Sequence, residues 1–273
     1  ADVLMGGAGN DTISGGAGID TADFSDSSSG VVVNLVSGTA TGDGTDTLSG
    51  IENAVGGSGN DTLTANNATG SELDGGAGSD TLNGGSSADV LYGGDGNDTV
   101  NAGAGNDELI GGAGNDTLNG GDGFDCAEYA ATTLGVTVNL QLGTASGSEI
   151  GSDKLSLIEA ACGGAGNDAL TAANTGSELE GGAGSDTLTG GTGADVLMGG
   201  AGNDTISGGA GIDTADFSDS SSGVVVNLVS GTATGDGTDT LSGIENAVGG
   251  SGNDTLTANN ATGSELDGGA GSD

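Results

Sequence analysis

One aliphatic side chain recurs every nine residues through most of the chain, separated by small and polar residues. From Gly75 the phrases run without a change of register: GGAGSDTLN, GGSSADVLY, GGDGNDTVN, AGAGNDELI, GGAGNDTLN and GGDGFDCAE. The same register covers Gly181 to Asp216, and in each of these phrases position six is Asp and position eight is Leu, Val, Ile or Ala. Successive side chains of a strand point to opposite faces, so the residue at position eight faces inward and its neighbours face outward. Each phrase therefore predicts a six-residue loop followed by a short strand.

Two phrases are expected to form one complete coil of a solenoid. The order within a coil is loop, strand, loop and strand, and successive coils stack as parallel strands about 4.8 Å apart. The aliphatic residues then form a thin ladder between two sheets, which explains how a chain with 2% aromatic residues can have a core. We predict an all-β fold, a parallel β-roll with two short strands per turn of about 18 residues.

Longer segments interrupt the repeat at about residues 21–55, 126–162 and 214–248. They alternate like strands in GVVVNL and GVTVNL, and the first returns to the repeat at TGDGTDTLS, residues 41–49. We therefore expect irregular coils of the same solenoid, with a bulged loop, rather than separate domains. These stretches are called the variant segments below.

A second repeat is far longer than the first. Residues 1–80 are identical to residues 194–273, an offset of 193 residues, and the identity includes freely substitutable positions such as SDSSSG. Two interpretations are open: one recent duplication within an ordinary protein, or a section of a tandem array with a period of 193 residues. The second is favoured because both ends of the sequence fall within a phrase, and it predicts one continuous solenoid over residues 1–273.

The composition requires a source of stability outside the chain. The sequence has 63 Gly among 273 residues, no Pro, Trp or His, and 40 acidic residues against the single base Lys154, a formal charge of −39. High charge and few large apolar groups do not repay the conformational entropy lost on folding. So acidic a surface repels nucleic acid and anionic membranes, and no apolar stretch is long enough for a membrane span. Multivalent cations are the partners that this charge favours.

The position of the aspartates indicates where cations bind. Loops one coil apart lie above one another, so their carboxylates form columns that repel one another unless a counter-ion lies between them. Glycines at positions one, two and four permit positive φ and turn carbonyl oxygens toward the gap between loops. Carboxylate and carbonyl oxygens around one point are the ligands that Ca²⁺ prefers. The phrase thus predicts a calcium site shared by two neighbouring turns.

The phrase GGxGxDxUx resembles the repeat of the RTX (repeats-in-toxin) family. About fifteen copies in register carry the resemblance over nearly the whole chain. It implies a right-handed parallel β-roll with calcium in the loops at both edges, folding that depends on Ca²⁺, and export through a type I secretion channel to the extracellular space or cell surface.

The resemblance assigns the position-six aspartates as calcium ligands, for on the order of ten or more ions. The two columns are exemplified by residues 80, 98 and 116 on one edge and 89, 107 and 125 on the other. Ser71 and Ser177 replace the aspartate in two loops, which we expect to be metal-free or weakly bound. The regular candidates are Asp2, Asp11, Asp20, Asp61, Asp80, Asp89, Asp98, Asp107, Asp116, Asp125, Asp168, Asp186, Asp195, Asp204, Asp213, Asp254 and Asp273. Weaker candidates, whose loops lack the leading glycine pair, are Asp46, Asp153 and Asp239.

Other chemistry has little support. Without His, a Ser/His or Cys/His catalytic arrangement cannot form within this chain, and we expect no enzyme activity. Cys126 and Cys162 flank a variant segment, and two interpretations are open: a disulfide formed outside the cell, or two buried thiols.

Three functions are weighed. A structural segment of a secreted fibre, surface layer or adhesin, joined end to end with copies of itself, is favoured by the 193-residue identity. The alternative is the secretion and folding module of an exported protease, lipase or alginate-modifying enzyme. An ice-binding adhesin domain is disfavoured, because loop position three is mostly Ala and forms no regular Thr row.

Overall fold

Strands and loops make up the fold, seen in a computed structural model that describes residues 1–259 and 263–273. No helix occurs among these described residues, and hence none with the length and apolar character needed to cross a membrane. The chain divides into two compact units. Unit 1 comprises Ala1–Glu128 and Glu149–Ile158, and unit 2 comprises Tyr129–Ser148 and Glu159–Asp273.

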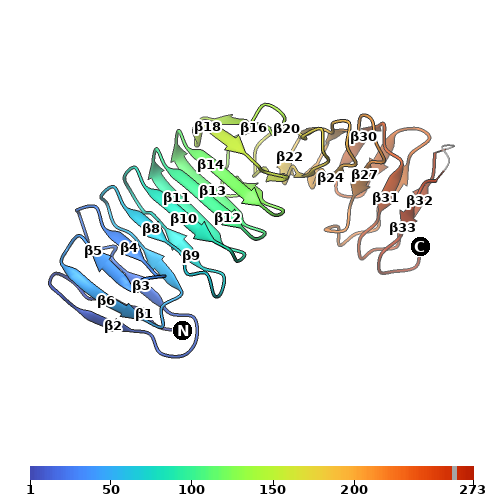
Figure 1. Cartoon of the computed structure of the whole chain (residues 1–273). Helices are drawn as coiled ribbons and strands as arrows, with labels where there is room; N and C mark the ends of the chain where they lie inside the picture. The colour runs from blue at the N-terminus through green and yellow to red at the C-terminus, as the bar shows by residue number, and fades with distance from the viewer. Residues whose placement is uncertain (260–262) are drawn as a thin grey trace. The chain divides into compact units, whose positions relative to one another are not determined.

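Unit 1 consists of two sheets, whose strands lie side by side in blue to green in Figure 1. Sheet A of this unit is parallel throughout, in the order β1 (Val3–Leu4), β3 (Thr21–Asp23), β7 (Asn53–Val55), β9 (Glu72–Asp74), β11 (Val90–Gly96), β13 (Glu108–Gly114) and β15 (Cys126–Glu128). Sheet B has the order β2 (Thr12–Ser14), β6 (Thr45–Ser49), β5 (Thr39–Thr41), β4 (Val32–Asn34), β8 (Thr62–Thr64), β10 (Thr81–Gly85), β12 (Thr99–Ala104), β14 (Thr117–Asp122) and β18 (Gly151–Ser156).

Unit 2 repeats this arrangement. Its sheet A contains β19 (Ala160–Cys162), β21 (Glu178–Glu180), β24 (Val196–Met198), β27 (Thr214–Asp216), β31 (Asn246–Val248) and β33 (Leu266–Asp267). Its sheet B contains β17 (Thr144–Gly147), β16 (Val136–Asn139), β20 (Ala169–Thr171), β23 (Thr187–Thr189), β26 (Thr205–Ser207), β30 (Thr238–Ser242), β29 (Thr232–Thr234), β28 (Val225–Asn227) and β32 (Thr255–Thr257). A two-stranded sheet joins β22 (Ala183–Gly184) and β25 (Ala201–Gly202) in the loops.

The register of the strands confirms the predicted all-β, parallel β-roll. Thr81 of β10 pairs with Thr99 of β12, which is 18 residues further along the chain, and the same step relates Val90 and Glu108 in sheet A. The side chains at position eight are the core: Leu82, Leu91, Leu109 and Leu118 have no exposed surface. One buried aliphatic residue per strand is enough to define each coil because its neighbours alternate outward.

The variant segment of unit 1 differs from the expected bulged loop. It contributes β4, β5 and β6 to sheet B, where a regular coil contributes one strand, and β5 is antiparallel to both neighbours. Sheet A receives no extra strand, since Thr21 of β3 pairs directly with Asn53 of β7. No pattern in the sequence predicts this antiparallel insertion, because TATGDGTDTLS is consistent with one loop followed by one strand. In unit 2, β28, β29 and β30 repeat the same pattern.

Glycine is required in the regular loops for two reasons. Gly94, at position two, has a φ of +102°, in the region that side chains rarely adopt. A Cβ atom there would also overlap the carbonyl oxygen of Gly76 in the loop beneath. Gly96, at position four, has a φ of +150° and lies against Gly78 in the same way. The glycines therefore allow one loop to stack directly on the backbone of the next.

Gly94→Ala is expected to destabilise the folded chain through two costs. The positive φ alone costs about 1–2 kcal/mol for a residue with a side chain. Overlap of the Cβ with the loop beneath adds ~1–3 kcal/mol. Urea unfolding in saturating calcium measures the change, and a loss no larger than the conformational cost would show that stacking does not require the glycine.

Candidate metal centre

The aspartates at position six form hydrogen-bonded columns along the loop edges. On the sheet B edge, the backbone N–H of Asp80 donates to Oδ1 of Asp98 at 2.7 Å, and that of Asp98 donates to Oδ1 of Asp116 at 2.8 Å. On the sheet A edge, Asp89 donates to Asp107 in the same way at 2.8 Å. These side chains are at most 3% exposed. One oxygen of each carboxylate thus fixes the column by pairing with the coil beneath.

The second oxygen of most column carboxylates is buried and has no hydrogen-bond donor. A buried polar atom without a partner costs free energy, and for a charged oxygen the cost is larger still. Such atoms in a native fold call for an explanation, and an ion is the simplest one when they recur in a column. The residues with a buried, unpartnered Oδ2 are Asp11, Asp20, Asp80, Asp89, Asp98, Asp107, Asp116, Asp186, Asp204 and Asp213.

The same burial changes the acidity of the column. The pKa of five of these carboxyls is raised from 3.8 to about 6, mainly because burial removes them from water. Backbone hydrogen bonds lower the pKa and neighbouring carboxylates raise it, and both effects are smaller than that of burial. The five are Asp80, Asp89, Asp116, Asp186 and Asp204. The pKa of Asp98, Asp107 and Asp213 is raised for the same first reason. The columns are therefore sites where positive charge is favoured.

This donor set fits calcium. Hard cations such as Ca²⁺ take oxygen ligands, and carboxylates supply both the ligand atoms and the compensating charge. In all of these aspartates except Asp11, the other carboxylate oxygen accepts a backbone N–H of the coil beneath, and this hydrogen bond fixes the direction of Oδ2 in the folded chain. When bound, the ion would supply positive charge between coils and no redox or hydrolytic chemistry.

The three weaker candidates lie in the same columns. The backbone N–H of Asp11 donates to Oδ1 of Asp46 at 2.9 Å, although the two residues are 35 positions apart. Asp116 donates to Asp153, and Asp204 donates to Asp239, both at 3.0 Å. The variant segments therefore return a carboxylate to the column even though their loops lack the leading glycine pair.

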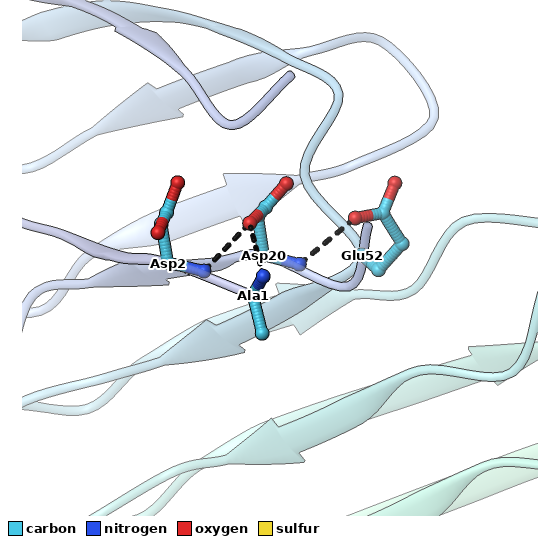
Figure 2. A network of polar contacts seen from close by, with 4 residues as sticks. All are labelled: Ala1, Asp2, Asp20 and Glu52. Atoms are coloured by element: carbon cyan, nitrogen blue, oxygen red, sulfur yellow. Dashed lines mark hydrogen bonds and ion pairs between the residues drawn. The ribbon is translucent and has the colours of Figure 1, made fainter. Parts of the chain in front are cut away.

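Two glutamates were missed by sequence reasoning. The backbone N–H of Asp20 donates to Oε2 of Glu52 at 3.0 Å, and Figure 2 shows Asp2, Asp20 and Glu52 in one row with their carboxylates on the same side. The N–H of Asp2 donates to Oδ1 of Asp20 at 2.6 Å, and the ammonium of Ala1 lies 3.7 Å from that oxygen. Glu245 occupies the matching position in unit 2. Their signal in the sequence is an acidic residue immediately before the strand NAV.

The remaining candidates have other surroundings. In Asp61, Asp168, Asp195 and Asp254 both carboxylate oxygens accept backbone hydrogen bonds. Asp125 is fully buried and its Oδ1 accepts the backbone N–H of Asp107 at 2.9 Å, as in the other members of the column, whereas Asp2 and Asp273 are exposed.

Serine takes the column position in two loops. The backbone N–H of Ser71 donates to Asp89 at 2.7 Å, and that of Ser177 donates to Asp195 at 2.8 Å. The serines thus keep the backbone ladder while contributing no carboxylate, which is the geometry expected of loops with weak or no metal binding.

The two cysteines are present as thiols in this structure and do not form a disulfide. Cys126 and Cys162 are both half-buried.

Comparison with known proteins gives one family. A family model described as the RTX calcium-binding nonapeptide repeat (4 copies) matches residues 1–22, 46–68, 74–109, 92–125, 180–215 and 239–261, more than half of the chain. A search of curated proteins gave no match.

The raised pKa values predict that acid partly replaces the cation. A carboxyl with a pKa of about 6 in the folded state and 3.8 in the unfolded state stabilises the fold fully below 3.8 and loses that contribution as the pH rises through about 6. The calcium-depleted chain should therefore gain β-structure as the pH falls from 7.5 to 4. Far-UV circular dichroism measures this, and a spectrum that loses strand signal on acidification would contradict the assignment.

Proposed function

The chain belongs to the family of RTX calcium-binding nonapeptide repeats, and we propose that it is a structural segment of a secreted extracellular fibre, surface layer or adhesin. The family identifies the chain as a calcium-binding repeat region of a secreted protein. Our proposal adds its mechanical role: ions bound between the coils make a flexible, anionic polymer stiff once it is outside the cell.

The observation that carries the proposal is the set of buried carboxylate oxygens without a donor. They recur coil after coil on both loop edges, so the ions would bridge successive turns rather than fill one isolated site. We propose the ten aspartates with such an oxygen as ligands, together with Asp125, which continues the column of Asp89 and Asp107. Asp46, Asp153 and Asp239 are proposed as further ligands because they share the backbone ladder.

The charge balance supports loading by many ions. On the order of ten Ca²⁺ would add ~+20 of charge, about half of the formal −39. Extracellular calcium modules typically bind at about 10⁻⁴–10⁻³ M, so the chain would stay unfolded at cytosolic calcium and fold after export. The difference in calcium concentration between the cytosol and the extracellular space would thus control folding.

The identity of residues 1–80 and 194–273 supports an array. It favours a period of 193 residues, with copies continuing end to end in one solenoid. The sequence contains no histidine for acid–base chemistry. The secretion and folding module of an exported enzyme is the alternative, and it would require a catalytic domain elsewhere in the same protein.

The proposal predicts a rod whose length follows the number of repeats. Chains with one, two and three copies of the 193-residue period should show a maximum dimension that rises in proportion to the copy number in millimolar calcium, and expanded, disordered chains in EGTA. Small-angle X-ray scattering and electron micrographs measure both. Compact globular particles of nearly constant dimension would contradict the structural role, and a chain that binds no calcium by isothermal titration calorimetry would contradict the proposal as a whole.

A further inference from the structure

The glycine loops fall into two classes according to where the second carboxylate oxygen points. In the regular loops Oδ2 of the aspartate has no donor, as in Asp98 and Asp204. In four loops it accepts the N–H of the position-two glycine of its own phrase. The donor and acceptor pairs are Gly57 to Asp61 at 2.7 Å, Gly164 to Asp168 at 2.9 Å, Gly191 to Asp195 at 2.8 Å and Gly250 to Asp254 at 3.0 Å.

The first oxygen of these four carboxylates is also occupied. Oδ1 of Asp61 accepts the N–H of Val31 at 2.7 Å, and Oδ1 of Asp254 accepts that of Val224 at 2.8 Å. Asp168 and Asp195 pair with the coil beneath in the same way. Both oxygens therefore accept backbone hydrogen bonds, and these hydrogen bonds stabilise the ionised carboxylate without an ion.

The backbone of the four loops differs as well. The position-two glycines of the regular GGxGxD loops have a positive φ, such as +102° for Gly94 and +82° for Gly200; Gly85, in the GGSSAD phrase of Asp89, does not. Gly57, Gly164, Gly191 and Gly250 lie outside that region, and so do the position-four glycines of the same four loops. The same GGxGxD phrase thus adopts two conformations, and only one of them leaves Oδ2 without a donor.

The loop beneath accounts for the difference. Gly57 stacks on the variant loop, where a side chain on it would meet the carbonyl oxygens of Ser27 and Phe24, and Ser58 donates to the Ser27 carbonyl at 3.0 Å. The hydroxyl of Ser27 closes that lower loop on itself by donating to the carbonyl of Ser29 at 2.9 Å. All four loops stack on a loop that lacks a leading glycine pair, within residues 24–30, 129–135, 172–177 and 217–223.

We propose that Asp61, Asp168, Asp195 and Asp254 bind no calcium and act as clasps that close their own loops. This inference rests on the proposed function, and it departs from the sequence prediction that all position-six aspartates are ligands. A GGxGxD phrase binds an ion only when the loop beneath it is also a glycine phrase, because the site is shared by the two. Asp89 lies outside this rule, because its phrase GGSSAD lacks the position-four glycine, and its Oδ2 has no donor.

Three of the four clasps lie next to a variant segment. Phe24, Val31 and Ile51 are buried around the segment below Asp61, with Phe217 at the matching place below Asp254 and Tyr129 in the loop below Asp168. Burial of these apolar side chains contributes stability where a clasp takes the place of an ion. Asp195 lies instead above residues 172–177, where the buried apolar side chain is Ala172.

The test compares clasp and column aspartates that are both almost fully buried. Asp61 and Asp98 are both 2% exposed, and Asp254 and Asp204 offer a second pair in unit 2. Native mass spectrometry of the full chain in millimolar calcium counts the bound ions. Asp61→Asn and Asp254→Asn should bind as many ions as the parent chain, whereas Asp98→Asn and Asp204→Asn should each bind at least one fewer.

Hydrogen exchange on the unmodified chain keeps the test decisive if a variant does not fold. At saturating calcium the amides of Gly57, Gly164, Gly191 and Gly250 should be protected from exchange, because each donates to its aspartate. Rapid exchange of these amides in the calcium-loaded, folded chain, or loss of an ion from Asp61→Asn equal to that from Asp98→Asn, would overturn the clasp proposal. Failure of the parent chain to bind calcium would instead overturn the proposed function.

Discussion

Repulsion between stacked carboxylates is the constraint on which this fold depends. Each column aspartate uses one oxygen to hold the backbone of the neighbouring coil, so the carboxylates are aligned by the same bonds that align the strands. The alignment leaves the other oxygen buried without a donor in most regular loops. In the proposed function, a cation between coils would remove the repulsion and hold the two loops together, so that metal binding and folding would be one event.

The other features of the chain follow from that arrangement. Glycine at positions two and four lets loops stack closely enough for two of them to share an ion, and a single aliphatic residue per strand suffices because the core does not have to hold the coils together alone. Under the clasp proposal, a carboxylate that closes its own loop replaces the ion where the loop beneath a GGxGxD phrase lacks the glycine pair. One source of stability would then replace another along the chain.

Much of this was predictable from sequence because the repeat is local. The nine-residue period fixed the 18-residue coil, the inward Leu82 and Leu91, and the columns of Asp80 and Asp89. What escaped prediction depends on the neighbouring coil rather than on the phrase itself. Glu52 joins a column by register with Asp20, β5 runs antiparallel inside a variant segment, and Asp61 is clasped by Gly57 although its phrase is regular. Reading each phrase together with the loop beneath it supplies the missing information for most of these loops.

Circular dichroism of the chain at neutral pH, first in excess EGTA and then in millimolar calcium, tests the central claim most directly. Bridging ions that supply the missing stability require a largely disordered spectrum in the chelator and an ordered strand spectrum in calcium, with the change reversed by further EGTA. The same well-ordered strand spectrum in both conditions would show that the stacked carboxylates need no ion, and would contradict the role assigned to calcium.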